Sequence, residues 1–270
     1  MASHDQPDAE ASRTPRVLVA AGPTHEPIDD VRYLANRSSG RLGAALAETS
    51  SKRGWPTTLL MGPCTARDRL EERIAGRRSA PGRPLADAAS HNNEPPSGQN
   101  GPAEQRVASH LDLVRFRTAA DLQALLLERV PAIDVLVMAA AVADFRPAGH
   151  VHGKLERGET ITLALEPVPD LLAEARRGMT GGAIAIGFAL EADAASDERG
   201  RRKLERKGCD AIVVNPLDTM DSADIDARIL FADADRPPRR VGPMGKAAFA
   251  SVLLDVAAEL WRAAGRPSPR

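Results

Sequence analysis

The chain has 270 residues and a formal charge of −1, with 36 Lys or Arg against 37 Asp or Glu. This length can bury one sizeable core, in one or two domains. The lack of a basic excess and an aromatic content of only 3% argue against a nucleic-acid-binding protein, which needs cationic surface and stacking side chains. No apolar run approaches the roughly 18 residues of a membrane span, and residues 1–14 are too polar for a signal peptide. We therefore expect a cytoplasmic protein, whose two cysteines, Cys64 and Cys209, are reduced and fit no metal-binding spacing.

The first regular segment is a strand that leads through a glycine-containing loop into a helix. Residues 17–21 form a short apolar run, typical of a buried parallel strand, and Gly22-Pro23 ends it. A polar loop then reaches Ser38-Ser39-Gly40, after which apolar residues recur at helical spacing from Leu42. This order of strand, glycine loop and helix directs free backbone N–H groups at a phosphate. The G-x-G-x-x-G pattern of dinucleotide-binding proteins is absent, so nicotinamide binding is a weak alternative.

The chain next predicts a strand at 57–61 and then loses its periodic pattern. Residues 64–109 are rich in Arg, Pro, Gly, Ser and Asn, so we expect a flexible excursion there. Its arginine cluster could bind phosphates, although a solvated flank is the commoner outcome. With 1–14 as a disordered tail and 266–270 as a second tail, we expect a single domain over 15–265.

Strands and helices alternate over the remainder of the chain. Strands are expected at 113–116, 134–139, 160–165, 183–189 and 210–214, with an antiparallel edge strand at 229–231. Helices are expected at 118–126, 169–177, 197–207 and 245–264. This alternation predicts an α/β, Rossmann-like three-layer fold, with a mainly parallel sheet and helices on both faces. Ligands of such folds bind beyond the carboxyl ends of the strands, so the loops 22–40, 141–154 and 188–191 are expected to converge on one cleft.

Three features of the later segments could bind a nucleotide by their chemistry alone. Small residues at 139–141 let a flat ligand approach the backbone, and Asp144 could bind a ribose hydroxyl or a metal ion; alternatively, the alanines only pack a tight turn. Lys203 and Lys207 lie one helical turn apart, so their ammonium groups could meet one anion or form a solvated basic face. Only five of the 36 basic residues are lysines, so each of them, including Lys154, is a candidate for a role that arginine cannot fill.

Five segments resemble the phosphopantothenate–cysteine ligase family. AGPTHEPIDDVRYLANRSSGRLG at 21–43 is similar to the opening motif of that family at nearly every fixed position. The later segments are MAAAVADFRP at 138–147, PVPDLL at 167–172, GFALE at 187–191, and 203–215. The resemblance does not extend to the flavin-binding decarboxylase domain that is fused upstream in many bacterial members, so we expect a stand-alone ligase.

The resemblance implies an enzyme of coenzyme A biosynthesis that joins L-cysteine to (R)-4′-phosphopantothenate. The carboxylate would attack the α-phosphate of a nucleoside triphosphate, and cysteine would then displace the nucleotide from the acyl-nucleotidyl intermediate. Mg²⁺ would accompany the triphosphate, and the close match to the bacterial pattern favours CTP over ATP. The family also implies a homodimer that shares the loop 22–40 between subunits. From the composition and hydropathy given above, we expect no nucleic-acid or membrane partner.

The same resemblance assigns roles to residues at matching positions. Lys154 would stabilise the triphosphate and Asn36 would hold the acyl intermediate. Arg32, Asn36 and Ala141 would bind phosphopantothenate. The nucleotide site would consist of Met138, Ala139, Ala140, Asp144, Lys154, Asp170, Leu171, Leu172, Ala173, Phe188, Lys203 and Lys207, with metal ligands unassigned. Glu156 and Arg157 replace two lysines of the family's K-x-K-K flap, so a non-catalytic nucleotide-binding module stays open beside an oxidoreductase.

Overall fold

The computed structural model describes residues 13–68, 70–71, 110–158, 160–191, 196–217 and 222–265. The predicted tails, apart from residues 13 and 14, and the predicted excursion beyond residue 71 lie outside the described residues.

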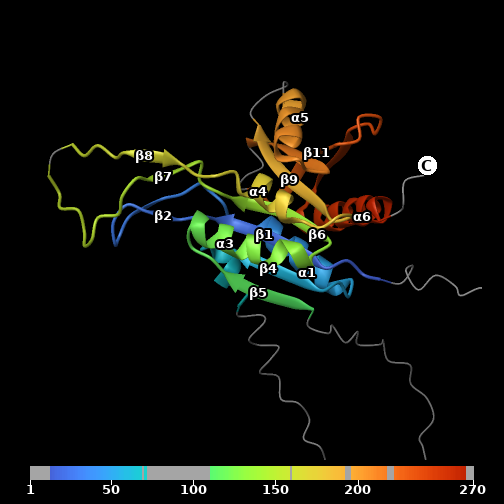
Figure 1. The fold of residues 1–270 in the computed structure, drawn as a ribbon, viewed down its shortest axis with the longest axis horizontal. Helices are drawn as coiled ribbons and strands as arrows, with labels where there is room; N and C mark the ends of the chain where they lie inside the picture. Colours follow the sequence, from blue (N-terminus) through green and yellow to red (C-terminus); the bar gives the residue numbers. More distant parts are fainter. Residues whose placement is uncertain are drawn as a thin grey trace, which may run out of the picture.

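An eight-stranded sheet forms the centre of the described structure (Figure 1). Its spatial order is β12 (Arg239–Gly245), β11 (Asp224–Phe231), β10 (Ala211–Pro216), β9 (Ile184–Glu191), β6 (Val135–Ala141), β1 (Val17–Pro23), β4 (Thr57–Met61) and β5 (Leu111–Arg115). All neighbours from β10 to β5 are parallel, whereas β11 and β12 are antiparallel to theirs. Numbered along the chain, the parallel strands have the order 3-2-1-4-5-6, in which the winding direction reverses between β1 and β6. The predicted mainly parallel sheet is confirmed, and this reversal is where such sheets bind ligands.

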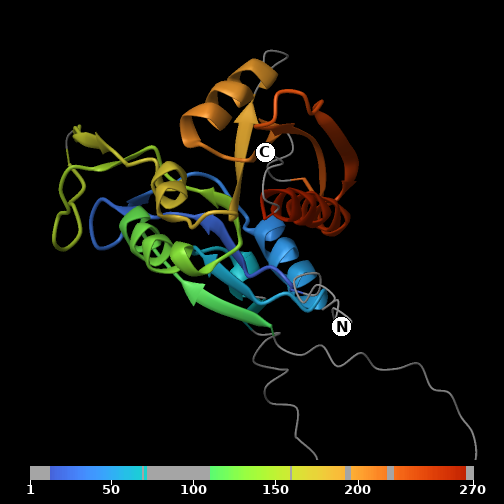
Figure 2. The same cartoon turned by 45° about the vertical axis from the view of Figure 1, so that its right-hand side comes forward.

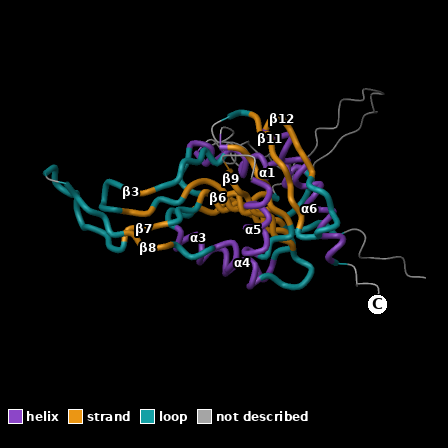
Figure 3. The backbone as a smooth tube through the Cα atoms, turned by 90° about the horizontal axis from the view of Figure 1, so that it is seen from above, coloured by secondary structure: helices purple, strands orange, loops and turns teal. Residues whose placement is uncertain are grey.

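Helices cover both faces of the sheet (Figure 3). One face carries α1 (Arg41–Lys52) and α6 (Lys246–Ala264); the other carries α3 (Ala119–Arg129), followed by η2 (Val130–Ala132), α4 (Leu171–Gly178) and α5 (Ser196–Lys207). Alternate residues of β1 serve the two cores: Val19 packs in the layer of α1 and α6, and Leu18 packs in the layer of α3 to α5. The predicted three layers are thus confirmed. In the described ranges, no helix is both long and apolar enough to cross a membrane.

Two strand predictions are wrong. Residues 160–164 are irregular and exposed, and only β8 (Leu165–Pro167) forms there, outside the main sheet, because the alternating apolar side chains point outward. Strand β11 is antiparallel, as predicted, but it is not the edge, because β12 pairs with its free side. Strand β12 was not predicted, since Gly242 and Pro243 interrupt it and most of its residues are exposed.

Two small antiparallel sheets project from the carboxyl end of the main sheet (Figures 1 and 2). Strand β2 (Glu26–Pro27) pairs with β3 (Tyr33–Leu34), and β7 (Phe145–Pro147) pairs with β8. A bridge between Asp29 and Val151 joins the two segments. We call residues 26–34, 145–158 and 160–167 the arm.

The described residues that follow β4 stay packed against the core. Residues 65–68 and 70–71 are helical, and Leu70 is buried in the core layer of α1 and α6. Glu71 is ion-paired to Arg115 of β5, whose Nε lies 2.6 Å from Glu71 Oε1. The described part of the predicted excursion therefore packs against the core.

Candidate active site

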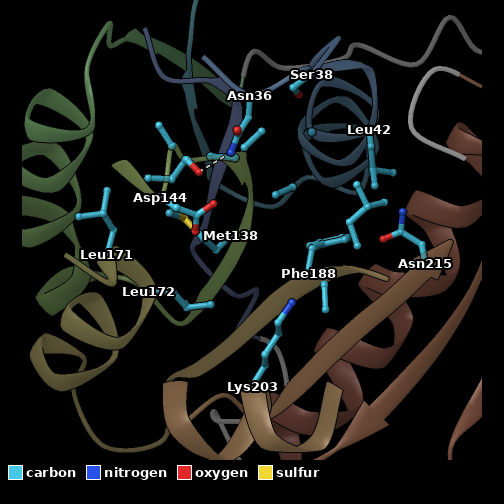
Figure 4. Close-up of a pocket in the computed structure, with 18 of the residues that line it drawn as sticks. Asn36, Ser38, Leu42, Met138, Asp144, Leu171, Leu172, Phe188, Lys203 and Asn215 are labelled. Atoms are coloured by element: carbon cyan, nitrogen blue, oxygen red, sulfur yellow. Dashed lines mark hydrogen bonds between the residues drawn. The ribbon is translucent and has the colours of Figure 1, made fainter. Parts of the chain in front are cut away.

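A pocket of about 910 Å³ lies at the carboxyl ends of β6, β9 and β10 (Figure 4). The loops 22–40 and 141–154 contribute residues 36–40 and 141–144, and β9 contributes residues 188–190. The first turns of α1 and α4, one side of α5, and single residues of β10, β11 and α6 complete the wall. Parts of all three predicted loops therefore converge, next to the reversal between β1 and β6.

The N-terminus of α1 presents backbone donors to this pocket. Gly40 precedes the helix with a φ of 69°, a conformation that favours glycine. No side chain caps the helix, so in the described part of the chain the N–H groups of residues 41–43 have no acceptor. A Cβ on Gly43 would lie 2.0 Å from the Cβ of Ala21, so a glycine is needed for α1 to approach β1 this closely. This is the geometry with which helix N-termini bind phosphate groups.

Asn36 and Asp144 present polar groups in the same part of the pocket (Figure 4). The Nδ2 of Asn36 donates a hydrogen bond to the backbone oxygen of Val142 at 2.8 Å. One N–H and the oxygen of the amide are left over for a ligand. No side chain or backbone group of the described residues donates to the Asp144 carboxylate. Both side chains are therefore available to a bound molecule.

Strand β6 has an unpaired backbone edge where it enters the pocket. Its pairing with β9 ends at Met138, opposite Gly187, while its pairing with β1 continues to Ala141, opposite Pro23. Among the described residues, no strand therefore pairs with the β9-facing backbone of Ala139 and Ala140. Phe188 lies across the pocket on β9 (Figure 4). A flat heteroaromatic ring could lie between this edge and Phe188, with its polar edge read by backbone groups.

Lys203 and Lys207 both line the pocket, but each ammonium group is paired with a different carboxylate. Lys203 Nζ donates to Glu191 at 2.7 Å, and Lys207 Nζ donates to both oxygens of Asp170 at 2.7 Å. Burial acts to raise the pKa values of Asp170 and Glu191. The hydrogen bonds and positive charges around each carboxylate, from Lys207 at Asp170 and from Lys203 and Arg199 at Glu191 above all, together lower both pKa values. An anion shared by the two lysines would thus have to draw them away from these partners.

The first turn of α4 forms another wall of the pocket. Asp170 caps this helix by accepting a hydrogen bond from the N–H of Ala173 at 3.2 Å. Leu171 and Leu172 are buried and line the pocket together with Ala173 (Figure 4). The residues predicted in this segment therefore reach the pocket, although the Asp170 carboxylate already serves as a helix cap and lysine partner.

Arg32 and Lys154 lie on the arm and do not line the pocket. Arg32 donates from Nε to Asp29 at 2.9 Å and from a terminal nitrogen to the backbone oxygen of Leu155 at 2.7 Å. Asp29 is 1% exposed; its burial acts to raise its pKa, but hydrogen bonds from Arg32 and from the backbone of Leu155, Arg32 and Val31 lower the pKa well below its usual range. Lys154 is exposed beside this network. Within one chain, the structure thus places both residues on the arm and outside the pocket.

The sequence analysis gave no role to seven polar residues that line the pocket: Arg37, Ser38, Ser39, Arg41, Arg206, Asn215 and Lys246. Asn215 lies near the carboxyl end of β10, so its position in the strand pattern could have identified it. Lys246 begins α6, and the scarcity of lysine in this chain was a usable signal.

Comparison with protein families gives one model that matches nearly the whole chain. The DNA/pantothenate metabolism flavoprotein C-terminal domain matches residues 13–81 and 82–260. The matched ranges include every residue that lines the pocket and the whole arm.

Two curated relatives share about a third of their aligned residues with the chain. The coenzyme A biosynthesis bifunctional protein CoaBC of Mycolicibacterium smegmatis is 34% identical over 212 residues, which cover 75% of this chain and 42% of the relative. A cysteine/cysteine sulfinic acid decarboxylase from an unknown prokaryotic organism is 34% identical over 205 residues, with 75% and 46% covered. The chain thus spans less than half the length of either relative.

Solved structures share the fold. The C-terminal domain of a coenzyme A biosynthesis bifunctional protein CoaBC superposes with a TM-score of 0.63 at 26% identity, covering 93% of this chain and 98% of that one. A Cab2 mutant in complex with phosphopantothenate-cysteine gives a TM-score of 0.63 at 20% identity, covering 94% and 89%.

Proposed function

Because the chain belongs to the family of the DNA/pantothenate metabolism flavoprotein C-terminal domain, we propose that it is a phosphopantothenate–cysteine ligase of coenzyme A biosynthesis. One observation carries the proposal: all five segments with ligase-like sequence, far apart along the chain, contribute residues to a single pocket. We further propose that residues 15–265 act as one ligase domain in the cytoplasm.

The chemistry requires two steps, because a carboxylate is a poor electrophile. In the first step, the carboxylate of 4′-phosphopantothenate attacks the α-phosphate of a nucleoside triphosphate and releases pyrophosphate. In the second, the amine of cysteine attacks the acyl carbon, an amide forms, and the nucleoside monophosphate leaves. Negative charge develops first on phosphate oxygens and then on the acyl oxygen, so both steps need fixed N–H donors and cations.

The nucleotide is proposed to occupy the pocket with its phosphates at the N-terminus of α1. Its base lies between the open edge of β6 and Phe188, which matches the predicted roles of residues 138–140. Mg²⁺ commonly binds through one or two carboxylates together with substrate phosphates. Asp144, which accepts no hydrogen bond from the described residues, fits as that carboxylate. When bound, Mg²⁺ would offset the charge of the triphosphate.

Asn36 is proposed to hold the acyl oxygen of the intermediate through its remaining amide N–H. Ala141, which lines the pocket nearby, would contact the pantothenate chain. Arg32 would bind an anionic group of phosphopantothenate, and Lys154 would stabilise the triphosphate. Because both of these cations lie on the arm, we propose that they act across a subunit boundary, in the pocket of a second copy of the chain.

The surface of the arm supports this dimer. Eight of the eleven large apolar side chains that are exposed in the described residues belong to the arm. They are Val31, Tyr33, Leu34, Phe145, Val151, Ile161, Leu163 and Leu165. Such a concentration on one projection is typical of a surface that is covered in the assembly.

The experiment that tests the function measures pyrophosphate release from triphosphate and phosphopantothenate, with cysteine omitted. A ligase releases pyrophosphate and forms the amide only when cysteine is added. An oxidoreductase or a non-catalytic nucleotide-binding module releases none, and that result would overturn the proposal. Parallel reactions with CTP and ATP test the expected preference for CTP.

Lys154→Gln sharpens the same assay. We expect this variant to lose pyrophosphate release, because a neutral side chain cannot offset the charge of the triphosphate. Lys52→Gln, at the exposed end of α1 and far from the pocket, is the matched control and should keep full activity. Equal rates in the two variants would remove Lys154 from the mechanism.

A further inference from the structure

Two imidazoles and a carboxylate gather on the arm, and none of the proposed roles uses them. Each of His150, His152 and Asp30 offers one ligand atom, and these atoms lie within 4.8 Å of one another. His150 Nε2 is 3.2 Å from Asp30 Oδ1. The two imidazole rings are nearly perpendicular, at 86°, with their centres 5.2 Å apart. All three residues are exposed, so an ion could reach them from solvent.

Backbone pairing brings the two histidines to one side of their segment. They flank Val151, which bridges to Asp29 and donates its N–H to the backbone oxygen of Ile28 at 3.1 Å. In an extended segment, residues two apart point to the same side. The i, i+2 spacing of His150 and His152 therefore turns both rings toward the neighbouring turn.

The carboxylate is fixed from the opposite segment. The N–H of Asp30 donates to the backbone oxygen of Gly153 at 3.0 Å, and the N–H of Gly153 donates to Asp30 Oδ2 at 2.7 Å. This second bond orients the carboxylate and leaves Oδ1 facing His150. A hydrogen bond of this kind, to the oxygen that does not bind the ion, is what holds carboxylate ligands in metal sites.

We propose that Asp30, His150 and His152 bind one divalent transition-metal ion of the Zn²⁺ class. Two imidazole nitrogens and one carboxylate oxygen suit Zn²⁺, Co²⁺ and Ni²⁺, whereas Mg²⁺ prefers oxygen ligands alone. Ligand atoms around a tetrahedral ion with bonds of about 2.0–2.1 Å lie about 3.3 Å apart. The pair His150–Asp30 already has this separation, and rotation of the exposed His152 ring completes the set. Water would occupy the remaining position.

The bound ion clamps two segments of the arm together. The segment that carries His152 continues directly into Lys154, and the turn that carries Asp30 continues directly into Arg32. An ion bound by both segments would limit the motion of Lys154 and Arg32 relative to each other. The site is distinct from the proposed Mg²⁺ site at Asp144, which lies in the pocket.

The binding test uses the full chain and metal alone, without nucleotide or phosphopantothenate, so it is independent of the proposed ligase activity. Titration with Co²⁺ should give the visible absorption of a four-coordinate Co²⁺ site, which saturates at one equivalent. Zn²⁺ should displace the bound Co²⁺, whereas excess Mg²⁺ should not. We expect His150→Asn and His152→Asn each to weaken binding by at least about tenfold, since the loss of a mere outer-shell partner already costs that much. His110→Asn, an exposed histidine outside the arm, is the matched control and should bind as the wild type does.

Trypsin tests the clamp itself. Zn²⁺ should slow cleavage after Lys154 and Arg157 in the wild type and leave the rate unchanged in a His150→Asn/His152→Asn double variant. The metal site would be overturned if the wild type and the double variant bound Co²⁺ with equal affinity. It would also be overturned if His110→Asn lost as much Co²⁺ affinity as the His150 and His152 variants. Tight binding without protection of these bonds would overturn the clamp.

Discussion

The pocket and the arm differ in how their residues are held. Around the pocket, side chains come from the ends of buried strands and from the first turns of helices, so packing within one chain fixes them. On the arm, short strands expose their apolar side chains, and the turn depends on hydrogen bonds to one buried carboxylate, Asp29. The difference teaches that packing within one chain fixes the walls of the pocket, whereas the arm, which carries Arg32 and Lys154, is held mainly by hydrogen bonds to Asp29.

The largest expected effect lies in the pocket, at Asn36→Asp. The substitution keeps the size but replaces the amide donor with a carboxylate that repels developing negative charge. Loss of one such donor costs about 10²–10³ in rate. We expect amide formation to fall by that factor while pyrophosphate release continues, so the acyl-nucleotide accumulates. Quenched reactions with labelled phosphopantothenate, analysed by mass, measure it.

Two outcomes would contradict this assignment. Normal amide formation without accumulated intermediate would leave Asn36 only its bond to Val142, as a residue that orders the loop. Equal loss of both steps would mean that the substitution had disrupted the pocket itself.

A second prediction compares the packing of the two regions through glycine. Gly43→Ala places a methyl group 2.0 Å from the Cβ of Ala21, so α1 must shift away from β1. Overpacking of this kind costs about 1–3 kcal/mol of unfolding free energy. Gly149→Ala on the arm meets no atom within 4 Å and should stay within about 0.5 kcal/mol of the wild type. Denaturant unfolding of both variants measures the contrast, and equal losses would refute it.

The same contrast explains which features could be predicted from sequence. Strands such as β1 and β6 are apolar on both faces, so their composition alone revealed them. The five motif segments likewise indicated the pocket, because parallel strands end at one edge of the sheet. The arm escaped prediction because its turn is set by bonds from Arg32 and Leu155 to Asp29, which no periodicity encodes.

The carboxylate with which each pocket lysine pairs could not be predicted from the sequence either. Lys203 and Lys207 were correctly expected on one side of α5, yet each pairs with a separate carboxylate, Glu191 and Asp170. Those carboxylates come from different elements, and only the packed fold decides which ammonium group they meet.

A third prediction concerns the exposed apolar surface of the arm. Val31 is 60% exposed, and we expect Val31→Asp to raise the dissociation constant of the proposed dimer at least about tenfold, since the buried charge would lack a partner. Leu127→Asp, on α3 and 47% exposed, is the matched control outside the arm and should leave the dimer intact. Sedimentation equilibrium measures both, and a wild-type chain that is monomeric at all accessible concentrations would contradict the prediction.

The smallest expected effect compares one ion pair from each region. Lys207 bonds to the partly buried Asp170 beside the pocket, whereas Arg146 and Glu166 form an exposed cross-strand pair on the arm, with side chains 41% and 45% exposed. Because Lys207 lowers the pKa of Asp170 despite burial, that pair stabilises the fold above the unfolded-state pKa of about 4, and the stabilisation is lost as the pH falls through the lowered folded-state pKa.

Lys207→Met removes the cation and leaves the burial of Asp170 uncompensated, so the folded-state pKa of that carboxyl should rise. The variant should therefore be less stable than the wild type at pH 7, by about 1 kcal/mol, since the pair is partly solvated. The deficit should shrink below about pH 4, because a protonated Asp170 no longer needs the ammonium group. Arg146→Met on the arm should change the unfolding free energy by less than about 0.5 kcal/mol at either pH, as exposed pairs do. Urea unfolding at pH 7 and at a pH below about 4 measures the difference in unfolding free energy between each of the two variants and the wild type. A deficit of Lys207→Met that stays constant between them would show that Lys207 acts through its packing and not through the charge of Asp170.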